Sequence, residues 1–356
     1  MLLLSKTNIL ADLENKCRFK SVFLYYMAIR LTTYYCSENI PSLPGNNFFH
    51  SKELFVVYEN TKGYIPILIV ATDGKIVLGK LLAAIRRNTV GIFFPNMIKK
   101  CEVYGSGEYF CAKEQQESLF GMLIEHLTAE TIRKCFLMEF RNLGNSLIGY
   151  RYFKENKYFA INWLRVRNKF EKGKPIEQDF SQSRIRQIRK ALKNGAQVME
   201  ATTPQEVEQF ARMLHKIYSA HIRKHYPSIE FFQHLIKTFN TAGQKLSAIY
   251  IVKYKNKIIG GSACAFSDNK AYLWFSGGMR KTYVKQYPGV LAVWAALKDA
   301  KEQGFESFEF MDVGLPFKRH SYREFVLRFG GSQSSTRRWF RFRWKWLNKL
   351  FRKLYE

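Results

Sequence analysis

The amino-acid sequence predicts an α+β protein built from two similar halves, each with a mixed, mostly antiparallel sheet flanked by helices. Three observations point to this fold class. The chain has 356 residues, which suits two domains of ordinary size. Its hydrophobic fraction of 47% and charged fraction of 24% are typical of a folded globular protein. One order of elements is predicted twice along the chain: helices, an antiparallel meander, a helix and a further strand.

The first domain is predicted to span residues 1–160. Asp73-Gly74 between two apolar runs is the strongest short signal, because this dipeptide favours a tight hairpin turn. The apolar, partly amphipathic start of the chain indicates helix up to Pro41, which ends it. The predicted elements are helical residues 1–40, a helix over Ser51–Asn60, strands over Ile65–Thr72 and Lys75–Ile85, a helix over Gln115–Lys134 and a strand over Cys135–Arg141.

The second domain is predicted over residues 161–335 and carries clearer helix signals. Gly195 is a good residue to follow a helix, and Thr203-Pro204-Gln205-Glu206 has the residue types of a capped helix start. The predicted elements are helices over Ser183–Asn194 and from Pro204 to about His221, a meander of Lys245–Tyr254, Lys257–Ser267 and Lys270–Gly277, a helix over Val290–Gln303 and a strand over Phe308–Asp312.

Residues 336–356 form a basic, aromatic tail. Thr336–Arg343 alternates aromatic and basic residues, which predicts a last strand, and Trp344–Tyr355 is predicted to be a short amphipathic helix. The tail holds eight Lys or Arg and one Glu, and three of the six tryptophans. Such a helix suits the interface of an anionic membrane, and it suits equally well a terminal helix that packs on the protein.

The composition limits the possible partners and compartments. A net charge of +28 attracts polyanions, which include nucleic acid, anionic lipid and phosphorylated substrates. Six cysteines without a Cys-x-x-Cys pair argue against structural zinc and a disulfide framework. The apolar runs are too short for a signal-peptide core or a membrane span, so we expect a cytoplasmic protein. His221 and His225 share a helix face, but a metal site needs a third ligand, so no metal is predicted.

The most informative segment runs from Tyr287 to Trp294. Pro288 and Gly289 precede an apolar helix, and a glycine there lets a ligand approach the backbone closely. The amide groups at the start of that helix, including that of Val290, would then bind an anion. The competing interpretation is an ordinary turn before a core helix.

The order of motifs around this segment resembles the second domain of the Fem-type transferases and their GNAT acyltransferase relatives. A strand leads into a proline-and-glycine-opened helix, and a strand ending in Asp312-Val313-Gly314 follows. Phe317-Lys318 and Phe329-Gly330-Gly331 then complete the series, and the basic helix at 183–191 resembles the one that opens this domain. The resemblance covers about 163–335 well and 45–160 more loosely. It implies two tandem GNAT-like domains, the first degenerate and the second carrying the active cleft.

The resemblance implies roles for ten residues, each with a simpler structural alternative. Lys318 would stabilise an oxyanion and Asp312 would orient an amine, although an aspartate there is as often a turn residue. Tyr272 or Tyr283 would move a proton, although packing is the commoner role of tyrosine. The residues expected to hold the donor are Pro288, Gly289, Val290, Arg184, Arg189 and Lys190, the last three of which also suit a solvated helix face.

The implied reaction is transfer of an acyl group from acetyl-CoA or another acyl-CoA, or of an aminoacyl group from charged tRNA, to an amine. The implied acceptor is a cell-envelope precursor or an amino sugar, which includes acceptors linked to lipid at the inner face of the cytoplasmic membrane. Two alternatives from other classes are a nucleic-acid-binding protein and a membrane-surface protein without activity. The first would follow from the charge and the aromatic fraction of 16%.

Overall fold

The computed structural model describes residues 29–88, 98–144, 147–219 and 226–355. The helix predicted at the start of the chain lies mostly outside these ranges, as does the pair His221 and His225. The predicted helix is wrong for Ile29–Tyr34, which form strand β1. Ile29 and Leu31 pack on one face of the sheet and Tyr34 on the other, so the two-residue period of a strand decides the structure there.

The remaining predicted elements are confirmed, with ends that differ by a few residues, and the described residues contain further helices and strands that were not predicted. The helices are α2 (Lys52–Glu59), α3 (Lys113–Thr131), α4 (Tyr150–Glu155), α5 (Gln182–Lys193), α6 (Pro204–Ser219), α7 (Ile229–Leu235), α8 (Pro288–Glu302), α9 (Ser321–Leu327) and α10 (Lys345–Tyr355). The strands after β1 are β2 (Tyr64–Asp73), β3 (Ile76–Asn88), β4 (Ile98–Tyr104), β5 (Glu108–Tyr109), β6 (Leu137–Arg141), β7 (Phe159–Lys169), β8 (Gln197–Glu200), β9 (Ser247–Tyr254), β10 (Lys257–Ser267), β11 (Lys270–Gly278), β12 (Ser307–Phe310) and β13 (Ser332–Phe342).

Each half of the molecule repeats one arrangement of strands. In the first half, β1 to β4 form an antiparallel meander, and after α3 the strand β6 pairs parallel with β4. In the second half, β8 to β11 form the meander, and after α8 the strand β12 pairs parallel with β11. The predicted fold class is therefore confirmed, including the duplication.

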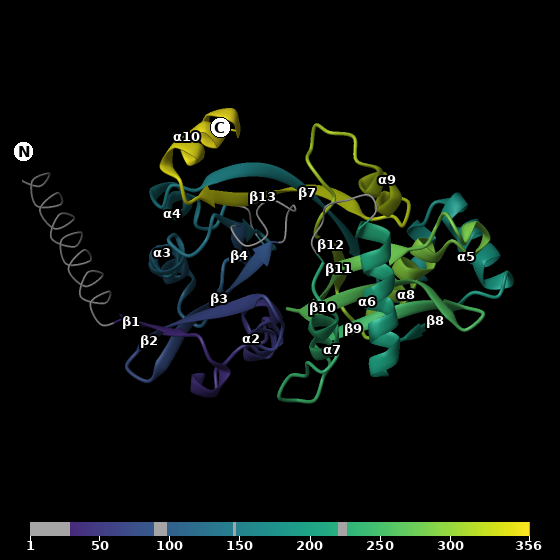
Figure 1. The fold of residues 1–356 in the computed structure, drawn as a ribbon, viewed down its shortest axis with the longest axis horizontal. Coiled ribbons are helices and arrows are strands. Elements are labelled where there is room, and N and C mark those ends of the chain that lie inside the picture. The colour runs from purple at the N-terminus through teal and green to yellow at the C-terminus, as the bar shows by residue number, and fades with distance from the viewer. Residues whose placement is uncertain (1–28, 89–97, 145–146, 220–225, 356) are drawn as a thin grey trace, which may run out of the picture.

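The two halves exchange their last strands. The strand that follows β6 in the chain is β7, but it pairs with β12 of the second half. The strand that follows β12 is β13, but it pairs with β6 of the first half. Since β7 and β13 also pair with each other over nine residue pairs, the described strands form one continuous 13-stranded sheet. Figure 1 shows these two long strands bridging the halves at the top of the molecule.

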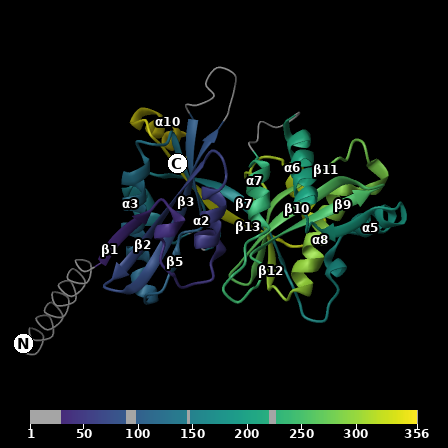
Figure 2. The ribbon, with the colours of Figure 1, turned by 60° about the horizontal axis from the view of Figure 1, so that its bottom comes forward.

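The sheet has an outer face on each half and an inner face that turns toward the other half. Helix α3 covers the outer face of the first half, and α8 covers that of the second. One apolar core joins the inner faces and includes side chains from α2, α6 and α7 together with Tyr104 and Tyr272. Figure 2 shows α2 on the first half near α7 and α6 on the second. The domain boundaries at 160 and 335 stay a prediction.

We expect the exchanged strand β13 to contribute strongly to stability. Trp339 is fully buried and its ring stacks on Phe153 with 4.4 Å between ring centroids. The substitution Trp339→Ala should lower the free energy of unfolding by about 3–5 kcal/mol, because it leaves a large cavity. Trp346, which is 65% exposed, is the matched control, and Trp346→Ala should change stability by less than about 0.5 kcal/mol. Urea unfolding of both variants measures this, and equal losses would contradict the stabilising role of β13.

Candidate active site

A cleft of about 600 Å³ opens between the inner faces of the two halves. This volume lies in the range of small-molecule sites. Aromatic side chains supply much of its lining: Tyr58, Tyr64, Tyr104, Trp163, Tyr226, Phe231, Trp274, Phe275 and Phe340. The charged and imidazole side chains that line it are Arg86, Lys100, Glu102, Glu139, Arg141, Asp312, Lys318, His320 and Arg338.

In the strands of the first half, side chains at every second position face the cleft, and these include the charged residues. Lys100, Glu102 and Tyr104 of β4 face the cleft, whereas Cys101 and Val103 between them pack in the outer core. The strand β6 follows the same rule, and in β13 Arg338 and Phe340 face the cleft while Trp339 packs in the outer core. Sequence reasoning missed this set of residues. The signal was clearest in β6, where the charged Glu139 and Arg141 alternate with apolar residues.

Two glutamates at the floor of the cleft are held by four cations. Lys100 lies 2.8 Å from Glu102 and also pairs with Glu139, while Arg141 contacts both carboxylates at 3.3 and 3.1 Å. Burial alone would raise the pKa of Glu102, but Lys100, Arg86 and Arg141 outweigh it and lower the pKa to about 2. The pKa of Glu139 is lowered in the same way, with Arg338 as its further cation. Both glutamates are therefore ionised at neutral pH.

Asp312 is positioned at the end of β12 by two donors. The indole Nε1 of Trp163 donates to Asp312 Oδ1 at 3.2 Å, and a guanidinium nitrogen of Arg338 lies 3.3 Å from the same oxygen. The Arg338 guanidinium also lies over the Trp163 ring, 4.0 Å from its centroid, and contacts Glu139 at 3.0 Å. The exchanged strands β7 and β13 thus hold the predicted acceptor-binding aspartate in place.

Lys318 reaches the cleft from the loop that follows Asp312. Arg323 braces this loop, since its guanidinium donates to the carbonyls of Leu315 at 2.7 Å and Lys318 at 2.8 Å. Gly314 has a φ of +89°, and a Cβ there would lie 2.7 Å from the His320 ring. Only glycine fits this turn, which explains the Asp-x-Gly pattern. The structure thus brings Asp312 and Lys318 to one cleft.

A β-bulge turns two consecutive aromatic residues toward the cleft. In the pairing of β10 with β11, Ala263 lies opposite Phe275 and Cys264 lies opposite Leu273, so Trp274 is the extra residue. Both Trp274 and Phe275 line the cleft as a result. The parallel pairing of β11 with β12 ends at Leu273 and Phe310, and β11 continues to Gly278 without β12. The two strands are no longer joined past this point.

The start of α8 packs on the strands at this end of β11. A Cβ on Gly278 would lie 2.4 Å from the nitrogen of Gly289, and a Cβ on Gly260 would lie 2.8 Å from the carbonyl oxygen of Pro288. A Cβ on Gly289 itself would meet nothing within 4 Å, so this position is open. The Val290 amide donates to the Tyr287 carbonyl at 2.9 Å, which leaves less of the helix start available to an anion than the sequence predicted.

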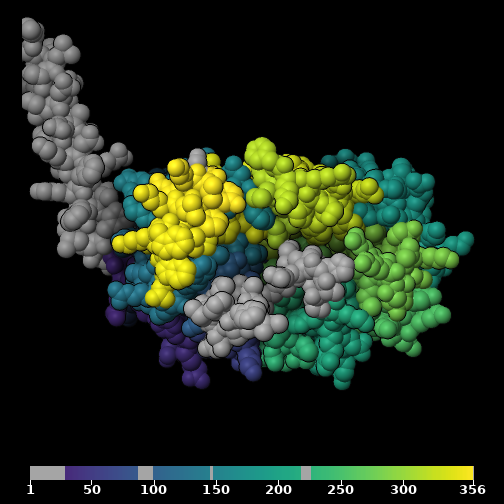
Figure 3. All heavy atoms as spheres, turned by 45° about the horizontal axis from the view of Figure 1, so that its top comes forward, coloured from purple at the N-terminus to yellow at the C-terminus, as the bar shows by residue number. Residues whose placement is uncertain are grey.

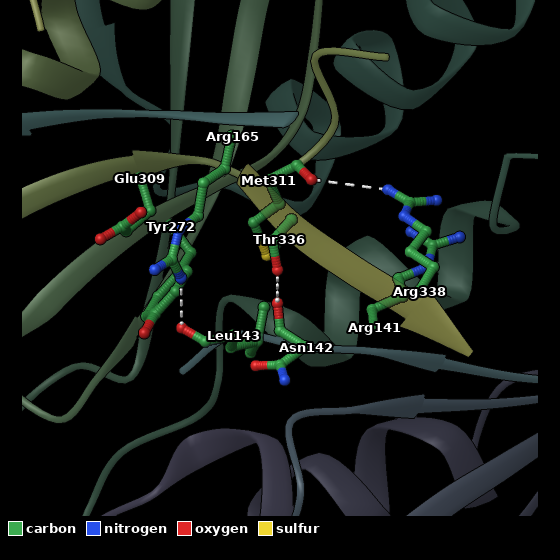
Figure 4. Close-up of a pocket in the computed structure, with 9 residues that line it drawn as sticks. All are labelled: Arg141, Asn142, Leu143, Arg165, Tyr272, Glu309, Met311, Thr336 and Arg338. Carbon is green, nitrogen blue, oxygen red and sulfur yellow. Dashed lines mark hydrogen bonds between the residues drawn. The ribbon is translucent and has the colours of Figure 1, made fainter. Parts of the chain in front are cut away.

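The two predicted tyrosines lie in different places. Tyr272 is buried beside the cleft, where burial raises its pKa well above the ordinary value, so its phenol is protonated. It lines a small pocket that Figure 4 shows, in which Arg165 donates to the Leu143 carbonyl at 2.9 Å. Tyr283 instead packs against Tyr254, with 6.0 Å between ring centroids, and does not line the cleft.

The three basic residues of α5 that were predicted to hold the donor differ in their exposure. Arg184 is 2% exposed, and its guanidinium is sandwiched between the rings of Phe325 and Phe329 at 4.5 and 4.2 Å. Burial, with a smaller effect of Arg328, lowers its pKa to about 10. It joins α5 to α9 and has no open face for a donor. Arg189 and Lys190 are exposed on a helix that packs near the start of α8.

The described residues offer neither a metal site nor a membrane span. Within the described ranges, no group of three His, Cys, Asp or Glu side chains is placed to hold a metal ion. Among the helices of those ranges, none is both long and apolar enough to cross a bilayer.

The comparisons with known proteins agree with this geometry. Residues 182–319 match the family model described as an acetyltransferase (GNAT) domain. A crystal structure of FemX superposes with a TM-score of 0.57 at 11% identity, covering 91% of this chain and 99% of FemX. L-PGS from Bacillus licheniformis superposes with a TM-score of 0.50 at 11% identity, covering 88% of this chain and 99% of that one. No curated protein sequence matches the chain.

The matched segment, residues 182–319, is therefore a GNAT acetyltransferase domain, and this domain supports acyl transfer as the class of reaction. The superposition covers 99% of FemX, so the chain shares the fold of FemX over both of its halves.

The ion pairs around Glu102 predict that the stability of the fold decreases in acid. The pKa of Glu102 is about 2 in the folded chain against an ordinary 4.5, so its ionised form stabilises the fold by up to about 3 kcal/mol at pH 7. That contribution is present above pH 4.5 and is lost as the pH falls toward 2. Glu102→Gln should therefore be less stable than the wild type at pH 7, and the difference should close in acid.

Urea unfolding between pH 7 and pH 2 measures this difference, with Glu302→Gln as the matched control because Glu302 is 63% exposed. The control should stay within about 0.5 kcal/mol of the wild type throughout. A Glu102→Gln profile that follows the control would show that the network adds no net stability.

Proposed function

We propose that the chain transfers an acyl or aminoacyl group to the amine of a cell-envelope precursor or amino sugar. The observation that carries this proposal is the meeting of Asp312 and Lys318 in one aromatic cleft, in a chain with a GNAT domain. The acceptor class rests on the resemblance to the Fem-type group, because the superposition on FemX at 11% identity speaks for the fold alone.

The cleft residues suit the chemistry of this transfer. The acceptor nitrogen attacks the carbonyl carbon of the donor, a C–N bond forms, and the bond to the thiol sulfur or tRNA ester oxygen breaks. Lys318 is exposed to the cleft and would stabilise the negative charge on the carbonyl oxygen. Asp312 accepts a hydrogen bond from the acceptor amine and orients it. The amine proton leaves to the departing group or to water, since the buried Tyr272 is already protonated.

The donor is proposed to approach from the start of α8. Trp274 in the cleft and Gly278 beside Gly289 lie four residues apart on β11, which is about 13 Å along a strand. A donor with a long thioester arm, such as acetyl-CoA or another acyl-CoA, could place its anionic end near Gly289 and its acyl end in the cleft. Arg189 and Lys190 would then lie on the side of the anionic end of the donor. Aminoacyl-tRNA is the alternative donor, consistent with the charge of +28.

The setting we propose is the cytoplasm, at the inner face of the cytoplasmic membrane, where a lipid-linked acceptor would be presented. The aromatic lining of the cleft would suit the non-reacting part of such an acceptor.

The role of Lys318 is testable by kinetics. Lys318→Ala should lower kcat/KM by roughly 10²–10³-fold, because one donor to the oxyanion is lost, and Lys318→Arg should recover part of it. Lys257→Ala removes an exposed lysine at the start of β10 and is the matched control. Transfer is measured with acetyl-CoA and with aminoacyl-tRNA against amino-sugar acceptors. Activity of Lys318→Ala equal to the control would exclude this lysine from the chemistry.

The donor site is testable by ligand-induced thermal shifts. Gly289→Val should leave the fold intact, because the position is open, and should abolish the rise in melting temperature that acetyl-CoA causes. Gly278→Val provides the contrast, since its side chain would collide with the α8 backbone and lower the melting temperature without ligand. An unchanged acetyl-CoA shift in Gly289→Val would contradict the donor site, and a shift with tRNA alone would select the other donor.

A further inference from the structure

The C-terminal helix α10 is attached to the sheet by one face. The Asn348 side chain accepts from the Phe342 amide at 3.0 Å and donates to the Lys157 carbonyl at 2.8 Å. The Phe351 ring packs on Phe342 at 4.8 Å and on Phe159 at 6.3 Å. These contacts fix the orientation of the helix, so the fold determines which of its faces is exposed.

That opposite face is apolar and exposed. Trp346, Leu350 and Leu354 follow one another at intervals of four residues, which places them on one side of the helix, and they are 65%, 48% and 67% exposed. Trp344, 49% exposed, stacks on Trp346 with 6.2 Å between centroids. Nothing in the described part of the chain covers this stripe. An apolar stripe of this kind on an anchored helix marks a contact surface.

The surroundings of the stripe are strongly cationic. Residues 343–355 contain five lysines or arginines and no acidic residue. All five are exposed: Arg343, Lys345, Lys349, Arg352 and Lys353. Tryptophan and leucine beside lysine and arginine match an interface that is apolar inside and anionic at its surface. Two of the three stripe residues, Leu350 and Leu354, are aliphatic and give bases no platform to stack on, which favours a lipid surface over nucleic acid as the occupant.

A second exposed apolar side chain lies on the loop that carries Lys318. Phe317 is 98% exposed and is flanked by the exposed Lys318 and Arg319. Phe340 lines the same cleft as Lys318, and its ring stacks on Phe159 with 5.9 Å between centroids. Because Phe159 also contacts Phe351, the cleft and α10 share one side of the sheet. Figure 3 shows α10 (yellow) beside the segment around residues 315–330 (yellow-green) on one face.

We propose that α10 and the Phe317 loop together form a two-point contact with an anionic phospholipid surface. The Trp346, Leu350 and Leu354 stripe enters the boundary between headgroups and acyl chains, and the flanking cations contact the anionic headgroups. Phe317 enters beside it and brings the mouth of the cleft to the membrane. This contact does not depend on the transferase activity.

Vesicle co-sedimentation of the full chain tests the contact, with phosphatidylcholine vesicles compared with vesicles containing about 30% phosphatidylglycerol at about 0.15 M salt. The wild type should bind the anionic vesicles at least roughly tenfold more tightly than the neutral ones. Leu350→Glu with Leu354→Glu should weaken binding to anionic vesicles by roughly tenfold or more, and Phe317→Glu should weaken it by a smaller factor.

The matched control is Ile76→Glu with Phe239→Glu, which places two carboxylates at apolar positions that are 67% and 44% exposed elsewhere. Unchanged melting temperatures verify that all variants fold. Equal vesicle binding by the stripe variant and the control would overturn the proposal. So would a stripe variant that loses self-association in size-exclusion chromatography, or tRNA binding, while vesicle binding stays the same.

Discussion

The pairing of β13 with β6 and β7 is the interaction on which the rest of the structure depends. Each half alone would end with an unpaired strand edge, which is costly for a sheet and open to aggregation. Exchange of the last strands closes both edges and joins the halves into one sheet. It also joins the two inner faces through one sheet, so the cleft between them is part of the fold.

The same strands determine the chemistry of the cleft. The side chains of β7 and β13 that face inward include Trp163 and Arg338, which hold Asp312 of the second half and Glu139 of the first. A buried carboxylate is tolerated only when cations compensate its loss of hydration. The cations around Glu102 and Glu139 therefore give the cleft a highly polar floor beneath aromatic walls. Such preorganised charges favour a reaction in which charge develops on a carbonyl oxygen.

Much of this could be predicted from local sequence patterns. The Asp73-Gly74 turn, the cap at Thr203 and Glu206 and the helix end at Gly195 each depend on neighbouring residues only, and each is found as expected. The order of motifs indicated Asp312 and Lys318. The exchange of strands could not be predicted, because Arg338 of β13 meets Glu139 of β6 across 199 residues of chain. The charged cleft floor was missed for the same reason: its members come from the strands β3, β4, β6 and β13 and meet only in the folded sheet.

The most direct test of the proposed transfer is a crystal structure with the donor that raises the melting temperature of the chain. We expect the acyl carbonyl to lie in the cleft between the halves, with its oxygen within hydrogen-bond distance of the Lys318 ammonium and its carbon facing Asp312. The anionic end of an acyl-CoA should then lie at Gly289. An ordered acyl group outside the cleft, with Lys318 and Asp312 pointing to solvent, would contradict the assignment of this cleft as the active site.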